Sequence, residues 1–502
     1  MMRAVQLEGR LFYAAVAAVA AFCLVFAYLP MVDLPQHYAM VSIFTHYHDP
    51  AYGFEARYTF DLLGRPYATV YVLGAGLAKI MPLGAAMRIV VAACTVAPVL
   101  GARALLAATG RPRMWALLAV PFSFGSVWFW GFLNFLAGTG MFLAGLALVV
   151  TSARTGSRRA AVALGVLAIA LLFTHVHGLF MLLALAPLFA WGWCRDGDSW
   201  RATLRGVFRT VLPLAPAAIA AAVFILSTWR QAVGAWPAID PGIGERIERF
   251  PEFLAAGLPA PWPLLSVLAI AGIAVVALLV RDRAQATARR QRIALGGALA
   301  SQILLYVVLP LNTSTATYVS ARHALLIVLL FLPVLPHVRR PGIALAAASA
   351  FALAGLVDAG VHFARFNSEA HEIDPILDAM KPNRRVASLI FENGSAHVHS
   401  ATFPYLHFAG YYQAANGGDL ARSFAVVWNV PVRYRDDYAR YAISDDIEWQ
   451  PGLFSPSEDL PHYDYVLVRG RNFRPPPPES GLIVVARSGP WTLVENPRAL
   501  PP

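Results

Sequence analysis

The segment LFYAAVAAVAAFCLVFAYL, residues 11–29, is an apolar run without a charged side chain, and PMVDLPQHY, residues 30–38, follows it directly. A helix of this length can cross the hydrocarbon core of a bilayer, which is ~30 Å thick. Arg3 and Arg10 precede the run, and basic residues beside a span favour the cytoplasmic side. We therefore expect a first membrane helix that leaves the cytoplasm and ends at an outer loop containing Asp33.

The rest of the chain has the same apolar character. Of its 502 residues, 58% are hydrophobic and 14% are charged, whereas soluble domains carry about 25% charged residues. The formal net charge of +11 is mostly arginine in short clusters between apolar segments. This pattern is typical of the cytoplasmic loops of membrane proteins rather than of a nucleic-acid-binding surface. The composition indicates a polytopic membrane protein whose partners include membrane lipids and no nucleic acid.

Apolar runs recur along the chain at lengths that suit membrane helices. They predict about eleven spans, at residues 11–29, 88–106, 114–129, 136–150, 160–173, 179–193, 211–227, 262–280, 293–311, 321–335 and 343–361. A further run, residues 67–83, is interrupted by Gly74, Gly76, Lys79 and Pro82. We interpret it as a partly inserted helix at the outer face, because a full span there would reverse every later arginine cluster. The N-terminus is then cytoplasmic and the C-terminus extracytoplasmic.

After His362 the chain carries mixed charges and turn residues, and no run is long enough to span a membrane. Short strands are predicted at residues 386–391, 465–468, 482–486 and 491–494. We predict an α-helical polytopic membrane protein with a transmembrane domain, residues 1–362, whose outer loop 31–87 carries interfacial helices. A small extracytoplasmic α/β domain, residues 363–502, follows it. Usage rich in alanine, arginine and leucine with hardly any lysine points to a bacterial inner (plasma) membrane.

Asp33 and His37 are the first candidates for chemistry. Ionisable residues at the end of a membrane span are costly to keep there, so they are functional-site candidates. If a helix begins after Asp33, positions i and i+4 share one face, and both side chains face one cleft. Alternatively, Asp33 is simply the N-cap of that helix, with Pro35 in its first turn.

Further groups near the expected outer face are candidates for supporting the site or for holding a divalent metal ion: His46, His48, Asp49, His175 and His177. His175 and His177 are two residues apart, so they share a face only where the backbone is extended. Otherwise they are interfacial histidines that cap a helix C-terminus.

Two basic positions, Arg88 and Arg322-His323, open helices at the expected outer face, against the positive-inside bias. A guanidinium that holds a phosphate explains such a position. A salt bridge to a carboxylate of an outer loop explains it equally well.

In layout, the chain resembles the GT-C superfamily of integral-membrane glycosyltransferases, which take a sugar from a polyprenyl-phosphate carrier. The resemblance rests on Asp33 in the first outer loop, Arg88 at the second full span and Arg322-His323 at a late span, and it covers the whole chain. Many members carry an acidic pair in this loop. Here Leu34-Pro35-Gln36-His37 follows Asp33, so no second acid is adjacent.

The resemblance implies a polyprenyl-phosphate-linked sugar donor and a lipid, glycan or protein acceptor. Asp33 would be the general base on an acceptor hydroxyl that attacks the anomeric carbon with inversion. His37 or a remote acid would take the second catalytic role. Arg322, with His323 and Arg88, would stabilise the lipid phosphate that leaves. A divalent metal ion is the cofactor left open.

Two other classes of function remain. A proton- or cation-coupled transporter would use Asp33, His37, His175 and His177 as ion carriers, and a non-catalytic envelope assembly protein would use the outer domain to bind a partner. The candidate charges lie at helix ends rather than deep inside spans, which favours the enzyme over the transporter. No phosphate-binding loop or nucleophile elbow occurs in its structural context.

Overall fold

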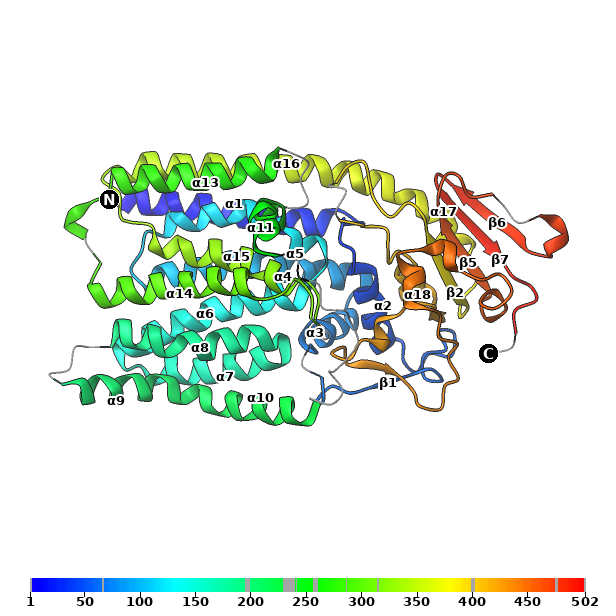
Figure 1. The fold of residues 1–502 in the computed structure, drawn as a ribbon, viewed down its shortest axis with the longest axis horizontal. Coiled ribbons are helices and arrows are strands. Elements are labelled where there is room, and N and C mark those ends of the chain that lie inside the picture. Colours follow the sequence, from blue (N-terminus) through cyan, green and yellow to red (C-terminus); the bar gives the residue numbers. More distant parts are fainter. Residues whose placement is uncertain are drawn as a thin grey trace. The chain divides into compact units, whose positions relative to one another are not determined.

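The computed structural model describes residues 2–65, 67–194, 199–228, 240, 242–255, 261–285, 287–313, 316–398, 402–474 and 477–500. The chain packs into two compact units (Figure 1). Unit 1 comprises Met1–Cys23, Val91–Trp128 and Phe132–Gly360. Unit 2 comprises Leu24–Val90, Phe129–Gly131 and Val361–Pro502.

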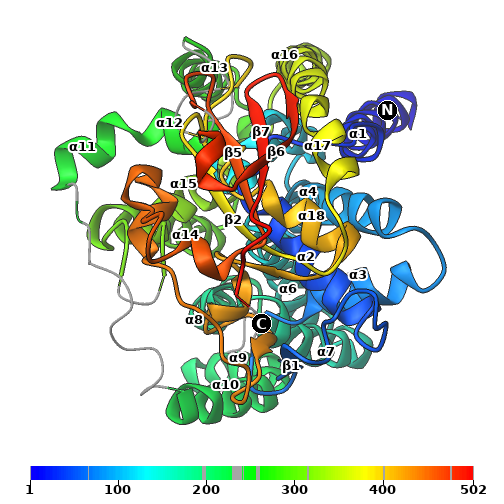
Figure 2. The ribbon, with the colours of Figure 1, turned by 90° about the vertical axis from the view of Figure 1, so that its right-hand side faces the viewer.

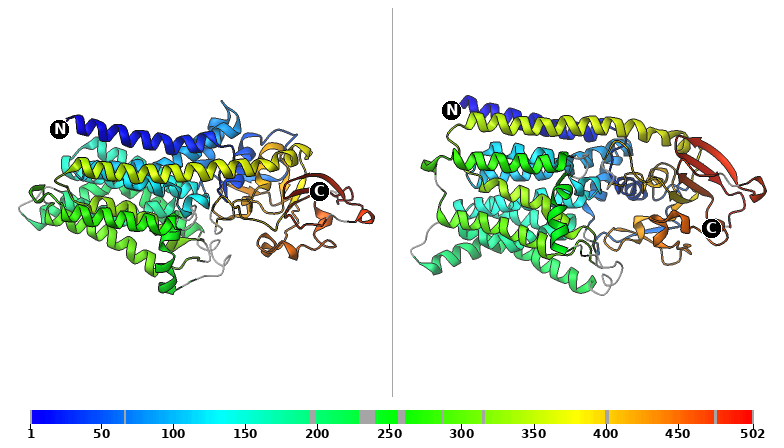
Figure 3. Two further views of the ribbon diagram at one scale, coloured as in Figure 1. Left: turned by 90° about the horizontal axis from the view of Figure 1, so that it is seen from above. Right: turned by 45° about the horizontal axis from the view of Figure 1, so that its top comes forward.

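Unit 1 is a helical bundle whose long helices run side by side (Figures 1 and 3). Its helices, some of which extend into unit 2, are α1 (Met2–Val25), α4 (Leu83–Ala108), η1 (Arg113–Phe124, a 3₁₀ helix), α5 (Ser126–Phe129), α6 (Leu133–Thr155), α7 (Arg158–Thr174), α8 (Val176–Trp193), α9 (Trp200–Val211), α10 (Ala215–Thr228), α11 (Gly242–Glu248), α12 (Phe250–Ala255), α13 (Trp262–Leu279), α14 (Arg289–Val308), α15 (Val319–Phe331) and α16 (Pro341–Ala370).

The predicted fold class is confirmed, since every predicted span coincides with a helix. Among the described residues, 8 helical segments are long and apolar enough to cross a membrane. The predicted spans at 114–129, 160–173 and 321–335 fold as the shorter helices η1, α7 and α15. The chain is a multi-pass membrane protein.

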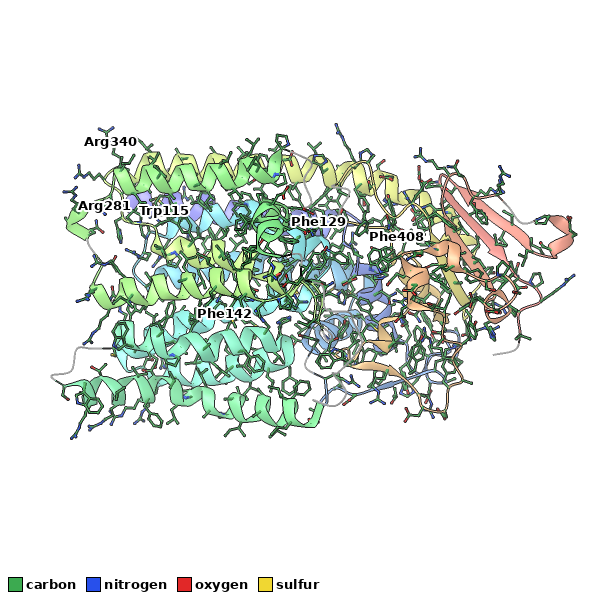
Figure 4. The ribbon with its side chains drawn as sticks, viewed as in Figure 1. Trp115, Phe129, Phe142, Arg281, Arg340 and Phe408 are labelled. Carbon is green, nitrogen blue, oxygen red and sulfur yellow. The ribbon has the colours of Figure 1, made fainter. Side chains whose placement is uncertain are left out.

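The basic connections of unit 1 gather at one end of its helices. Figure 4 shows Arg281 and Arg340 at the same end. A backbone bridge joins Arg281 to Val338, and Nε of Arg111 donates to the carbonyl of Pro333 at 2.7 Å. Because basic loops favour the cytoplasm, we expect this end of unit 1 to lie on the cytoplasmic side.

The interrupted run at residues 67–83 forms only a short helix, α3 (Thr69–Ala78), which packs against α2 (Leu34–Thr45) within unit 2. Its 10 residues rise about 15 Å, roughly half the thickness of the hydrocarbon core. The helix is too short to cross a membrane.

Unit 2 contains a five-stranded mixed sheet in the order β3-β2-β5-β7-β6, in which β2 pairs in parallel with β3 and β5 (Figure 2). The strands are β2 (Arg385–Ile390), β3 (Asp419–Leu420), β5 (Tyr465–Arg469), β6 (Ile483–Ser488) and β7 (Trp491–Glu495). The four predicted strands are confirmed. Every residue of the central strand β5 is buried, whereas the edge strand β6 alternates between exposed and half-buried positions, as one covered face requires.

The loop that carries Asp33 packs with the C-terminal residues in unit 2. Strand β1 (Tyr58–Phe60) pairs antiparallel with β4 (Val432–Tyr434), and helix α18 (Ala409–Asn416) packs on α2. The close approach of these helices needs a glycine, because a Cβ at Gly410 would lie 2.5 Å from the carbonyl carbon of Pro35. Residues far apart in the sequence thus share one core.

A buried carboxylate fastens β1 to β4. Asp419 accepts hydrogen bonds from the hydroxyls of Tyr58 at 2.9 Å, Tyr434 at 2.6 Å and Tyr438 at 3.2 Å. The backbone N–H of Leu420 donates to the same carboxylate at 2.8 Å. All of its partners are neutral groups, so the carboxylate is held by hydrogen bonds rather than by an ion pair.

Candidate functional site

Asp33 stands at the start of α2, with Pro35 in the first turn, but its side chain makes no capping hydrogen bond. Its Oδ1 atom instead lies 3.2 Å from Nδ1 of His407, and the carboxylate is only 14% exposed. The sequence left open whether the Asp33 side chain caps α2. In the structure it does not cap the helix, and the carboxylate faces His407.

His407 precedes α18 and lies between two carboxylates. Its Nδ1 faces Asp33, and its Nε2 donates to Oε1 of Glu448 at 2.7 Å, with the imidazole 10% exposed. Glu448, at the end of the 3₁₀ helix η7 (Asp445–Glu448), accepts a second bond from Nη2 of Arg422 at 2.8 Å. Asp33, His407, Glu448 and Arg422 form what we call the charge chain. Arg422 also pairs with the exposed Asp445.

The contacts within the charge chain change the pKa values of its two inner residues, His407 and Glu448. Burial lowers the pKa of His407, but the contacts with Asp33 and Glu448 outweigh burial and raise that pKa to about 9. Burial raises the pKa of Glu448, but His407 and Arg422 outweigh it and hold that pKa below its ordinary value. At neutral pH His407 is therefore an imidazolium that lies beside the ionised Glu448.

His37 is buried one turn into α2, and both of its ring nitrogens are engaged. Its Nε2 lies 2.9 Å from the carbonyl of Gly131, and its Nδ1 lies 3.0 Å from the hydroxyl of Tyr71. A carbonyl can only accept, so Nε2 carries the proton and Nδ1 accepts from Tyr71. Burial lowers the pKa of His37, and the attraction of Asp33 only partly opposes it. His37 is a neutral group with fixed orientation.

The loop residues His46, His48 and Asp49 make separate local contacts. His46 stacks on the ring of Tyr52 at 4.2 Å, and His48 pairs with the exposed Glu55 at 3.1 Å. Asp49 accepts from a backbone N–H two residues further on. In the described part of the chain, no group of three or more His, Cys, Asp or Glu side chains is arranged to hold a metal ion.

A second group of candidates lies together in unit 1. The backbone is extended at His175, between α7 and α8, and this break brings His175 to Arg322 in the first turn of α15. Nη1 of Arg322 donates to Nε2 of His175 at 3.3 Å, and the guanidinium lies 4.7 Å above the ring of Phe132. The ring of His177 is 6.0 Å from that of His175 and 5.0 Å from that of His323. We call these four residues the Arg322 cluster.

Two nitrogen atoms of this cluster are left for a ligand. Nδ1 of His323 donates to the side-chain carbonyl of Gln302 at 2.8 Å, which fixes the ring. Nε2 of His323 and Nε2 of His177 are buried, and neither has a hydrogen-bond partner among the described residues. Buried polar atoms are normally paired, so these two nitrogen atoms are candidate contacts for a polar ligand.

Arg88 is the remaining basic candidate. Its Nε donates to the carbonyl of Gly84, in the preceding turn of α4, at 3.3 Å. It forms no ion pair with a carboxylate of the described residues, so the salt-bridge explanation of its position finds no partner in the part of the chain that the structure describes.

His407, Glu448 and Arg422 were not candidates from the sequence. They lie in three different connections between the strands of unit 2, and their partner Asp33 is near the other end of the chain. The available signal was a lone histidine inside the apolar and aromatic stretch PYLHFAGYY, residues 404–412.

No protein-family profile and no curated protein match the chain. Several solved structures match the chain in fold. ArnT from Cupriavidus metallidurans in the apo state aligns with a TM-score of 0.54 and 13% identity, covering 99% of this chain and 100% of ArnT. The same protein bound to undecaprenyl phosphate aligns with a TM-score of 0.51 and 12% identity, covering 98% and 99%. The Archaeoglobus fulgidus oligosaccharyltransferase in complex with Zn and sulfate gives a TM-score of 0.42 and 11% identity, covering 91% and 68%. At such identities, the match to ArnT shows a shared fold over the whole chain.

Proposed function

We propose that this chain, which has the fold of the GT-C superfamily, is a membrane glycosyltransferase that moves a sugar from a polyprenyl-phosphate carrier to an acceptor hydroxyl. The observation that carries the proposal is the Asp33 carboxylate. It lies at the start of a helix that it does not cap, and it is held by an imidazolium. A buried, oriented carboxylate suits a general base.

In the proposed reaction Asp33 is the base. Its Oδ1 faces His407, and its Oδ2 has no hydrogen-bond partner among the described residues. Oδ2 accepts the acceptor proton while the acceptor oxygen attacks the anomeric carbon with inversion. General-base catalysis of this kind contributes about 10²–10⁴-fold to a rate. His37, fixed by Tyr71 and Gly131, keeps the first turns of α2 in place beneath the base.

The leaving lipid phosphate needs positive charge rather than a strong acid. We assign this role to Arg322 and His323, with Arg88 as a further cationic contact. The buried, unpaired Nε2 atom of His323 supports the assignment, because it leaves an unsatisfied polar position beside Arg322 for a polar ligand to fill. The capture of ArnT with undecaprenyl phosphate supports a polyprenyl-phosphate lipid as the partner. The proposed compartment is a bacterial inner membrane, with the reaction on its extracytoplasmic face.

The function is tested on purified protein in lipid with a panel of polyprenyl-phosphate sugars. We expect release of free polyprenyl phosphate that depends on both donor and acceptor. Donor-independent proton or cation flux into sealed vesicles, with no release from any donor and acceptor pair, would contradict the proposal and favour a transporter.

Replacing Arg322 with Gln should raise the KM for the donor about 10–100-fold, because a charge-assisted hydrogen bond contributes roughly 1.5–3 kcal/mol. The KM for the acceptor should not change. Arg322→Lys should be intermediate, since lysine keeps the charge and loses the planar fork.

Arg249→Gln is the matched control in unit 1, because Arg249 is already paired with Glu245 and Glu252. Equal donor KM values in Arg322→Gln and Arg249→Gln would remove Arg322 from the phosphate site.

A further inference from the structure

His407 has contacts that a role in packing alone does not explain. A neutral imidazole has one N–H donor and one acceptor, yet both nitrogens of His407 face carboxylate oxygens, at 3.2 Å and 2.7 Å. Only the Nε2 contact is a hydrogen bond, and Nδ1 lies at ion-pair distance from Asp33. A ring held between two carboxyl groups is attracted by both when it is protonated, so this position favours the imidazolium form. Arg422 holds Glu448 in its ionised form from the other side.

We infer that His407 is a positioning residue that stays protonated between Asp33 and Glu448 and thereby holds the Asp33 carboxylate in place for proton transfer. This inference rests on the proposed function, because it explains how Asp33, the general base of that reaction, is held in position.

The charges around His407 support this role. At the start of α2 it is faced by Asp33 and the neutral His37, and from η7 by Glu448, whose other oxygen is paired with Arg422. The ring of Phe424 covers it at 5.7 Å. His407 is the only cation of the described residues within ion-pair distance of Asp33. Without it, the nearly buried carboxylate would have no cationic partner within ion-pair distance among the described residues.

In the proposed step two bonds break and two form. The acceptor O–H bond breaks and its proton moves to Oδ2 of Asp33, while a new bond joins the acceptor oxygen to the anomeric carbon. The bond from that carbon to the phosphate oxygen breaks, and its electron pair leaves with the phosphate. His407 keeps both of its protons throughout: its Nε2–H group donates to Oε1 of Glu448, and its Nδ1 stays at ion-pair distance from Oδ1 of Asp33.

The test is the pH dependence of kcat/KM for wild type, His407→Gln and Glu448→Gln. The range from pH ~6 to ~10.5 includes both the ordinary pKa of a histidine and the raised pKa of His407. Since the pKa of His407 is about 9, wild-type activity should fall on the alkaline side with a midpoint near that pH. Glu448→Gln should move this midpoint to lower pH, because His407 loses an anionic partner. His407→Gln should lower the rate about 10–100-fold and lack the alkaline fall.

The matched control is His371→Gln, which removes an exposed histidine paired with Asp374 elsewhere in unit 2. It should keep the wild-type profile. An alkaline midpoint that is the same in wild type and Glu448→Gln, or a wild-type profile in His407→Gln, would overturn the inference. If His407→Gln fails to fold, the midpoint in Glu448→Gln still decides.

A second measurement needs no turnover. The folded-state pKa of His407 lies above its ordinary value of 6.5, so its stabilising effect is complete below pH 6.5 and is lost as pH rises through about 9. The wild-type Tm should therefore fall over this interval more than that of His407→Gln. If this difference in Tm is seen but no donor is turned over, the proposed function is wrong and the inference that His407 is protonated between Asp33 and Glu448 stands. If donors are turned over but the Tm difference is absent, the inference about His407 is wrong.

Discussion

Asp33→Asn should lower the rate of polyprenyl-phosphate release by about 10²–10⁴-fold, the usual contribution of a general base. Asparagine fills the same space at the start of α2 but cannot take the acceptor proton. Because the base acts in the transition state, donor affinity should change little while kcat falls. Single-turnover release, measured with saturating donor and acceptor, checks this directly.

Two comparisons make the Asp33→Asn result specific. Asp436→Asn changes a carboxylate of unit 2 that is 99% exposed and only loosely paired, at 3.8 Å, with Arg433, so its turnover should match wild type. The Tm of Asp33→Asn should show that the protein is folded. Turnover that survives in Asp33→Asn would reject Asp33 as the base and leave another group to accept the proton.

Much of the fold was accessible from the sequence because membrane spans and buried strands obey strong local rules. Apolar length identified the helices, and short runs bounded by Gly, Pro and Asn identified β2, β5, β6 and β7. The pairing of β1 with β4 was not accessible, since each has 3 residues and the two are far apart in the chain. Such short strands exist only because tertiary packing pairs them.

Some residues of the candidate site could likewise be selected from the sequence, whereas others are brought to the site only by tertiary packing. Asp33 could be selected because a charge next to a span is costly, and Arg322 because it opposes the positive-inside bias. No local rule links His407 to Asp33, because the link exists only once α18 packs on α2. His175 and His177 were selected separately from Arg322 and His323, and the break between α7 and α8 brings His175 to Arg322.

Asp419→Ala should lower the free energy of unfolding by about 3–5 kcal/mol, because several buried hydrogen-bond donors lose their acceptor and each costs roughly 1–3 kcal/mol when left unpaired. The carboxylate is 6% exposed and accepts from Tyr58, Tyr434 and Tyr438, whose hydroxyls would be left without an acceptor. Thermal unfolding followed by circular dichroism, with protein and lipid concentrations held constant, measures the loss.

Tyr438→Phe is the matched control for Asp419→Ala. It removes one donor at 3.2 Å and leaves the other partners of Asp419 in place, so the expected loss is about 1 kcal/mol. Equal Tm values for Asp419→Ala and wild type would show that the tyrosine hydroxyls find other partners. Because Tyr58 and Tyr434 are register partners in β1 and β4, the loss should also expose this short ladder to hydrogen exchange. The loop that carries Asp33 contains β1, so Asp419→Ala should reduce turnover only as far as it reduces the folded fraction. The Asp33→Asn variant, by contrast, should lose turnover while fully folded.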